Sequence, residues 1–190
     1  VNRTLFHGAY RRTASFFENS ELAAAALPGT AERSLLEPFR YRLPPEVLTR
    51  VYRPPAGAGD GENRRGLRTA LRALRGAGWV SREGRMFDPT GAPARFEILL
   101  IRPRNERLAL TLARKLGRLG IEVAVRTVDS AQYQNRLNSY DFDMILYLWD
   151  ESLSPGNEQA FYWGARAAGV EGTRNYPGIK DAAVDAMIGH

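Results

Sequence analysis

A strand–helix–strand pattern in the middle of the chain constrains the fold more than any other feature of the sequence. Residues 96–101 form an apolar segment of strand length, and residues 121–128 form a second one with alternating character. Between them, residues 104–119 place leucines along one side of a helix, and Gly120 follows as its cap. Such a βαβ unit almost always has a right-handed crossover. The sequence therefore predicts an α/β fold.

A third apolar run, residues 142–149, extends the predicted sheet. Its apolar side chains are nearly continuous, which is typical of a strand at the centre of a sheet that is covered on both faces. A short helix over residues 130–139, with Asp129 as its N-cap, precedes the run. We expect a mixed sheet that contains the βαβ unit and is flanked by helices.

The first third of the chain has a different character. Residues 10–62 contain many prolines and glycines and show little periodicity. Short helices are expected near residues 31–37 and 44–49, the second of them starting at a proline pair. A loop-rich stretch of this length is usually functional or wraps another part of the molecule.

The helical and strand signals sharpen after this stretch. Residues 63–76 carry leucines on one helix face and arginines on the opposite face, and two turns within residues 80–94 indicate a hairpin-like excursion. We therefore divide the chain into a loop-rich segment that borders a cleft, residues 1–62, and an α/β core, residues 63–190.

Both ends of the sequence resemble interrupted helices. Residues 1–9 have the pattern of a helix tail that stops at Gly8, with no visible beginning. A last amphipathic helix begins at Asp181 and reaches His190 after about two turns, which is marginal for a helix without packing partners. We expect the chain to be a piece of a longer protein.

Several kinds of chemistry lack the residues they require. The chain has no cysteine, and no run approaches the roughly 20 apolar residues of a membrane helix. Its two histidines, His7 and His190, lack partners at ligand spacing, so no metal, cofactor or histidine base is expected. The run Gly57–Gly61 lacks the lysine and the serine or threonine of a P-loop, and a flexible loop is the favoured interpretation.

The net charge of +6 raises the hypothesis of a nucleic-acid-binding domain. Nearly all basic residues are arginine, and the one dense cluster runs from Arg64 to Arg75. An arginine face on a helix is more often solvated surface than a phosphate-binding face. We favour the solvated surface and keep a basic nucleic-acid-binding α/β domain as the alternative function.

Two carboxylates follow the third predicted strand. Asp150 and Glu151 lie where open α/β sheets bind their ligands, so they either receive a cationic group or simply begin a loop. Asp141 and Asp143 lie at the start of the strand and do not match a calcium loop. Ser152 lacks the Gly-x-Ser-x-Gly elbow of a nucleophile. We find no catalytic set and expect no enzyme.

Four segments in a fixed order carry a resemblance to a known family. They are VNRTLFHGAYRRTASFFENSELA, RALRGAGW, AQYQNRLNSYDFDMILYLWDESLSPGNEQAFYWG and TRNYPGIKDAAVDAMI. Together they resemble the C-terminal lobe of the extracellular (periplasmic) solute-binding proteins of family 5, which serve peptide and nickel ABC transporters. The resemblance is greatest to the branch for oligopeptide and microcin C uptake.

This resemblance implies a function and a setting. The complete protein would have a signal peptide and an N-terminal lobe upstream, and it would act in the periplasm as a monomer. Two hinged lobes would enclose an oligopeptide or peptide-like ligand, and closure would present the complex to the permease subunits of an ABC transporter. The chain would supply the C-terminal, ligand-binding lobe of this two-lobed periplasmic binding protein.

The resemblance also implies a ligand site. In related peptide receptors a Trp-x-x-Asp segment binds the α-amino group of the peptide. Trp149 matches the tryptophan, but Ser152 stands in the fourth position, so Asp150 and Glu151 are the candidate substitutes. The remaining candidates are Asn157, Glu158, Trp163, Arg174, Asn175, Tyr176 and, from the first segment, Phe16. Core packing is the competing interpretation for each aromatic residue.

Overall fold

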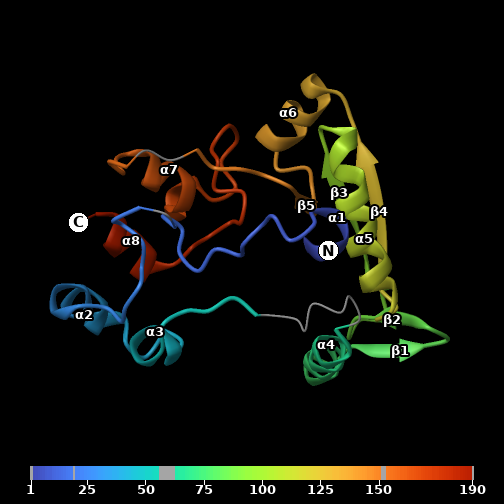
Figure 1. Ribbon diagram of the computed structural model, residues 1–190, viewed down its shortest axis with the longest axis horizontal. Helices are drawn as coiled ribbons and strands as arrows, with labels where there is room; N and C mark the ends of the chain where they lie inside the picture. Colours follow the sequence, from blue (N-terminus) through green and yellow to red (C-terminus); the bar gives the residue numbers. More distant parts are fainter. Residues whose placement is uncertain (1, 19, 56–62, 151–152, 190) are drawn as a thin grey trace. The chain divides into compact units, whose positions relative to one another are not determined.

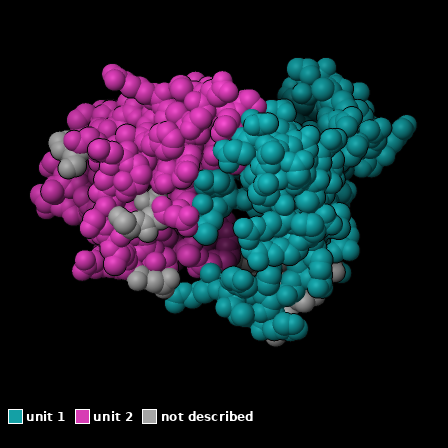
Figure 2. Space-filling model, turned by 90° about the horizontal axis from the view of Figure 1, so that it is seen from above, with its two compact units in different colours: residues 1–11, 56–136, 141–148 teal, residues 12–55, 137–140, 149–190 magenta. Residues whose placement is uncertain are grey.

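The computed structural model describes residues 2–18, 20–55, 63–150 and 153–189. The chain divides into two compact units, each assembled from segments that are distant in the sequence. Unit 1 comprises residues 1–11, 56–136 and 141–148, and unit 2 comprises residues 12–55, 137–140 and 149–190 (Figure 2). The glycine run 57–61 and the candidate site residues Glu151 and Ser152 lie outside the described residues.

Unit 1 is built on a parallel sheet. Among the described residues its strands are, in spatial order, β4 (Glu122–Thr127), β3 (Arg95–Leu100) and β5 (Met144–Ile145). Ile98 of β3 lies opposite Val125 of β4 and opposite Met144 of β5. A 3-10 turn, η2 (Pro103–Asn105), and helix α5 (Glu106–Gly117) connect β3 to β4 (Figure 1). The predicted α/β fold with a βαβ unit is confirmed.

The core of unit 1 lies between this sheet and α5. Ile98 and Leu100 of β3 and Ala109 of α5 are buried, and half-buried side chains of the neighbouring strands pack on them. Leu99 points to the other face of the sheet and is also fully buried. β3 is therefore the central strand, buried on both faces.

The third strand differs from the prediction. The apolar run 142–149 predicts a long central strand, but β5 contains two residues and Leu148 is 77% exposed. β3 is equally apolar and pairs with β4 on one side and with β5 on the other. β3 is therefore the central strand, and β5 lies at the edge. At the start of β5, the Asp143 carboxylate accepts a hydrogen bond from the Glu97 backbone N–H at 2.8 Å. Where the pairing of β3 with β5 ends, a side-chain carboxylate thus replaces the backbone acceptor of this N–H group.

An ion-pair network ties the sheet to helix α6 (Ser130–Asn138). The half-buried carboxylate of Glu97 on β3 accepts hydrogen bonds from Arg126 of β4 at 2.7 Å and from Arg136 of α6 at 2.8 Å. The hydrogen bond to Glu97 raises the pKa of Arg136. Arg136 also pairs with Asp141 at 2.9 Å. The predicted cap of α6 is confirmed, since the Asp129 carboxylate accepts a hydrogen bond from the Gln132 N–H.

The rest of unit 1 follows the sequence pattern. Helix α4 (Arg64–Gly76) begins at Asn63, whose side chain accepts a hydrogen bond from the Gly66 N–H at 3.2 Å. Strands β1 (Val80–Arg82) and β2 (Arg85–Phe87) form the predicted hairpin, and the turn at Glu83 and Gly84 has positive φ at both residues. Near the start of the chain, α1 (Asn2–Leu5) is a single turn.

Unit 2 is formed from short helices and long connections. Its elements are α2 (Thr30–Leu36), η1 (Glu37–Phe39), α3 (Glu46–Thr49), α7 (Glu158–Trp163), η3 (Ala165–Ala167) and α8 (Ala182–Ile188). Helix α8 contacts both α2 and α7. The predicted start of this helix at Asp181 is confirmed, because Asp181 is its N-cap and accepts a hydrogen bond from the Ala183 N–H at 2.8 Å. In the described part of the chain, no helix combines the length and apolar character needed to cross a membrane.

Candidate functional site

Aromatic side chains from distant segments meet in unit 2. The ring centroids of Trp149 and Trp163 lie 4.9 Å apart, with the ring planes tilted by 42°. Phe16 packs edge-on against Trp163 at 5.1 Å and against Phe17 at the same centroid distance. The separations of 4.5–7 Å at tilted or edge-on angles are those that aromatic pairs prefer. Residues 16 and 163 are far apart in the sequence, so the fold brings them together.

Tyrosines extend this cluster on the side of Trp149. The ring of Tyr176 lies 6.5 Å from that of Trp149 and 5.8 Å from that of Tyr140. The hydroxyl groups of Tyr140 and Thr173 share a hydrogen bond of 2.5 Å, which fixes the outer tyrosine. We call the set Phe16, Phe17, Tyr140, Trp149, Trp163 and Tyr176 the aromatic cluster.

The aromatic cluster is only partly covered. Phe16 is 49% exposed, and Trp149, Trp163 and Tyr176 are half-buried. A core aromatic side chain would lose nearly all of its exposed surface on folding. These residues therefore differ from core aromatic residues in keeping part of their surface exposed.

Arg174 lies beside the cluster with its charged group exposed. The Trp149 indole N–H donates to the Arg174 carbonyl oxygen at 3.4 Å, and the Arg174 guanidinium donates to the Tyr162 hydroxyl at 3.5 Å. Asp150 follows Trp149 directly and is also exposed. The Trp149 indole thus contacts the backbone of Arg174, and Asp150 is its neighbour in the sequence.

Asn175 has a different environment from its neighbours in the candidate list. Its side chain is fully buried, and its Nδ2 donates to the carbonyl oxygens of Gly164 and Ile179, both at 2.9 Å. Its Oδ1 accepts from the Ile179 N–H, also at 2.9 Å. The amide of Asn175 is thus engaged within the fold, where it joins the end of α7 to the 175–179 turn.

Glu158 and Asn157 lie at the start of α7. The Glu158 carboxylate accepts a hydrogen bond from the Gly156 N–H at 2.7 Å, and this bond is the main reason that the pKa of Glu158 lies below its ordinary value. A carboxylate is also favoured at a helix N-terminus by the helix dipole. Asn157 is the N-cap residue, its side chain is exposed, and it makes no cap hydrogen bond.

A tight backbone contact positions Trp163 at the other end of α7. Gly164 follows Trp163, and a Cβ atom at this position would lie 2.5 Å from the Ala160 carbonyl oxygen. The Gly164 N–H donates to that same oxygen at 3.0 Å. A side chain at position 164 would clash with this oxygen, so glycine is required where the helix ends directly after Trp163.

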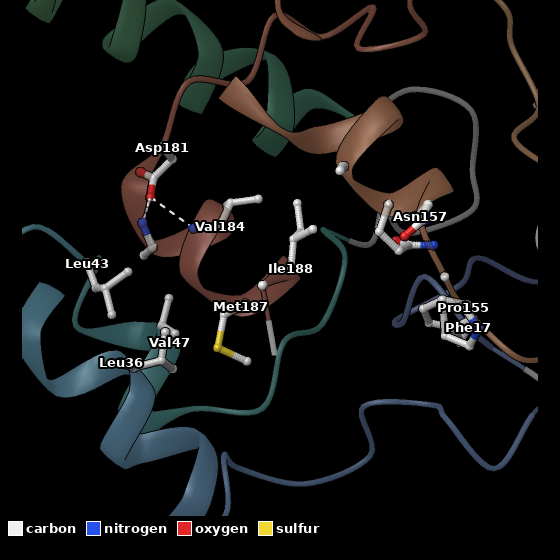
Figure 3. Close-up of a pocket in the computed structure, with 15 residues that line it drawn as sticks. Phe17, Leu36, Leu43, Val47, Pro155, Asn157, Asp181, Val184, Met187 and Ile188 are labelled. Carbon is white, nitrogen blue, oxygen red and sulfur yellow. Dashed lines mark hydrogen bonds between the residues drawn. The ribbon is translucent and has the colours of Figure 1, made fainter. Parts of the chain in front are cut away.

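An apolar groove with a volume of about 1010 Å³ also lies in unit 2 and shares Phe17 with the aromatic cluster (Figure 3). Its apolar lining comes from α2, α3 and α8 and from the chain around them, and consists mainly of Leu36, Leu43, Val47, Val184, Met187 and Ile188. Phe17 and Asn157 lie at one end of the groove. Asp181 also lines it, but its carboxylate is engaged in capping α8. Few polar groups are free to bind a ligand there.

The structure sorts the sequence-predicted residues into three groups. Phe16, Trp149, Trp163 and Tyr176 meet in the aromatic cluster, and Arg174 adjoins them. Asp150 follows the cluster in the chain, whereas Asn157 and Glu158 belong to the start of α7. Asn175 is engaged inside the fold.

Sequence reasoning did not identify Tyr140 as a member of the cluster, nor the apolar groove. Tyr140 has a φ of 56°, a turn conformation that is uncommon for an aromatic residue and leaves no signal in the sequence. The groove leucines belong to the proline-rich segment, where no periodicity marks them as one face. Among the described residues, no group of three or more metal-ligating side chains is present.

Comparison with known proteins shows which family this chain resembles. The family model described as "Bacterial extracellular solute-binding proteins, family 5 Middle" matches residues 1–170. In Agrobacterium fabrum, the probable peptide-binding protein YejA is 41% identical and the peptidoglycan-binding protein YepA is 36% identical. Each alignment covers 99% of this chain and 31% of the relative, so the chain spans less than a third of the length of these curated relatives.

A solved structure shares the fold. The oligopeptide-binding protein AppA from Bacillus subtilis, in complex with a nonapeptide, matches with a TM-score of 0.57 and 23% sequence identity. The match covers 64% of this chain and 24% of AppA. The resemblance carried by the four sequence segments is thus confirmed by the family model, by the curated relatives and by a shared fold. The chain belongs to family 5 of the bacterial extracellular solute-binding proteins.

Proposed function

We propose that the chain forms the ligand-binding C-terminal lobe of a receptor that captures oligopeptides or peptide-like compounds for import by an ABC transporter. The observation that carries the proposal is the partly exposed aromatic cluster, in which Phe16, Trp149, Trp163 and Tyr176 meet from distant segments. The relatives YejA and YepA, named as peptide-binding and peptidoglycan-binding, support this class of ligand.

The chemistry of the cluster suits a peptide. Aromatic rings give large contact area with few rotatable bonds, so they bind extended ligands of varied sequence at low entropic cost. The Arg174 guanidinium can hold a carboxylate with two hydrogen bonds. The Asp150 carboxylate is the candidate partner for an α-amino group, with Glu151 and Ser152 as further candidates in the same segment. A peptide supplies both kinds of charged group.

The remaining predicted residues take supporting roles in this proposal. Asn175 positions Arg174 and Tyr176 by holding their turn against the end of α7. Glu158 stabilises the start of α7, and Asn157 is left with an exposed amide for a ligand. The apolar groove, which Asn157 also lines, is lined mainly by apolar side chains, so the aromatic cluster is the better candidate for a peptide main chain.

The proposal extends to the rest of the receptor. A second, N-terminal lobe would cover the cluster and enclose the ligand, because ligand sites bury most of the surface of what they bind. Hinged closure would present the loaded receptor to the permease subunits of the transporter. Such a receptor acts in the periplasm after export, works as a monomer and catalyses no reaction.

Calorimetric titration of the complete gene product with peptides of graded length tests the site. Trp149→Ala removes the central ring of the cluster and is expected to weaken binding by about tenfold or more. Trp149→Phe retains a ring, so its affinity for peptides is expected to lie between those of the unmodified protein and of Trp149→Ala. Tyr41→Ala serves as the matched control, because Tyr41 lies in unit 2 but is 99% exposed and outside the cluster.

Two results would count against the proposal. The first is unchanged affinity of Trp149→Ala for every peptide that the unmodified protein binds. The second is an equal loss in Tyr41→Ala, which would show that the assay responds to aromatic content rather than to this site. Circular dichroism of each variant confirms that the lobe remains folded.

A further inference from the structure

The positive charge of the chain is concentrated in one unit. Within the ranges of unit 1 there are 18 basic and 10 acidic residues, a net charge of +8, whereas unit 2 has 9 basic and 11 acidic residues, a net charge of −2. The proposed ligand site belongs entirely to unit 2. The net positive charge therefore belongs to a different unit from the proposed ligand site.

Helix α4 concentrates this charge further. Its sequence, RRGLRTALRALRG, contains five arginines and no acidic residue. At 3.6 residues per turn, all five fall within an arc of about 100° around the helix axis. We call these residues, Arg64, Arg65, Arg68, Arg72 and Arg75, the arginine stripe.

The arginine stripe faces solvent. All five arginines are exposed, whereas Leu67, Leu71 and Leu74, which occupy the adjoining arc, are half-buried. Along the axis the stripe extends over about 16 Å, since each helical residue rises about 1.5 Å. The helix thus has a half-buried leucine side and an exposed side with a linear array of arginines.

A linear cationic array fits an extended anionic surface better than a single small anion. It also differs from a protein-binding surface, because stable protein interfaces have an apolar centre with aromatic anchors. The exposed arc of α4 contains arginines and no large apolar residue. An anionic phospholipid surface needs only such positive charge to attract a segment electrostatically.

We propose that the arginine stripe of α4 docks unit 1 on an anionic phospholipid surface. The family is described as extracellular, and a protein outside the cytoplasm meets membrane surfaces. The leucines of α4 are half-buried and lie outside the arginine arc, so the helix would lie on the headgroups through its charged side alone. The docking would hold the protein near the membrane while the aromatic cluster stays free for its ligand.

Vesicle co-sedimentation at about 0.1 M salt, where the Debye length is about 10 Å, tests the proposal with the intact chain. Vesicles of phosphatidylcholine with phosphatidylglycerol are expected to bind it, and vesicles of phosphatidylcholine alone are not. The variant Arg68→Gln/Arg72→Gln/Arg75→Gln removes three charges, each contributing about fivefold at an anionic surface, so binding falls about a hundredfold. Glutamine retains helix propensity, and circular dichroism checks the helix content.

A matched variant distinguishes an effect of the arginine stripe from an effect of the total charge of the chain. Arg42→Gln/Arg53→Gln/Arg166→Gln removes the same charge from exposed positions of unit 2 and is expected to bind within about threefold of the unmodified chain, because charges away from the contact are screened by salt. An equal loss in both triple variants would overturn the proposal, as would equal binding to neutral vesicles. Stripe-dependent binding to duplex DNA or to an acidic peptide without binding to phosphatidylglycerol would also overturn it.

Discussion

Asn175 holds a turn together from a fully buried position. Its Nδ2 donates to two carbonyl oxygens, of Gly164 and Ile179, and its Oδ1 accepts from the Ile179 N–H. The bond to Gly164 joins two segments that carry site residues, since Trp163 precedes Gly164 and Arg174 and Tyr176 flank the asparagine; the two bonds to Ile179 close the turn itself. A buried amide with full hydrogen bonding stabilises the fold, and removal of its donors leaves acceptors unpaired.

We expect Asn175→Asp to destabilise the protein by about 3 kcal/mol, because a carboxylate oxygen would replace the NH₂ group that faces two carbonyl oxygens. Urea unfolding at neutral pH, followed by circular dichroism, measures the change. Asn157→Asp is the matched control, since Asn157 is exposed and the change there should stay within about 0.5 kcal/mol. Equal stabilities of the two variants would show that the amide of Asn175 does not lock the turn.

Residue type predicted the cluster only in part. Trp149, Trp163, Tyr176 and Phe16 follow from the resemblance and from their aromatic character, and the structure brings them together. Whether an asparagine faces a ligand or the interior depends on tertiary packing, which is why Asn175 could not be told from Asn157 by sequence. The roles of these residues toward a ligand remain predictions.

Gly120 joins α5 to β4 through a conformation that other residues rarely adopt. Its φ is +80°, and a Cβ atom there would lie 2.8 Å from the Gly84 carbonyl oxygen and from the Met86 backbone nitrogen. The Met86 N–H donates to the Gly120 carbonyl oxygen at 2.9 Å. The end of the βαβ helix is thus packed directly against the hairpin of β1 and β2.

Gly120→Ala is expected to lower the free energy of unfolding by about 2–4 kcal/mol, since it combines a left-handed backbone with two close backbone contacts. Gly117→Ala, three residues earlier, is the comparison: nothing lies within 4 Å of its Cβ position, and it ends a helix. Alanine there should leave stability unchanged or raise it by up to about 1 kcal/mol. Thermal or urea unfolding distinguishes the two, and a tolerated Gly120→Ala would contradict the observed contact.

Elements with strong local signals were predicted well. Periodicity, glycines and cap residues close in the sequence predict the βαβ unit, helix α4 and the hairpin. They also predict the cap of α6 and the start of α8. The position of β5 depends on which strands pair, and hydropathy does not determine pairing between two equally apolar runs. Its length and its place beside β3 therefore required the structure.

At the scale of the whole chain, charge and ligand chemistry are separated. Unit 1 carries the net positive charge and the arginine stripe, and unit 2 carries the aromatic cluster. Each unit is assembled from discontinuous segments, and such assembly has no marker in composition or in linker residues. The division at residues 62 and 63 thus stays a prediction about the lobe of a longer receptor.

A crystal structure of the complete gene product with a bound peptide tests most directly whether the aromatic cluster is the ligand site. We expect the rings of Trp149 and Trp163 within about 4 Å of the ligand, and Arg174 or Asp150 hydrogen-bonded to one of its charged groups. A peptide bound elsewhere, for example in the apolar groove beside Leu36 and Met187, with both tryptophan rings contacting only protein, would contradict the proposed site.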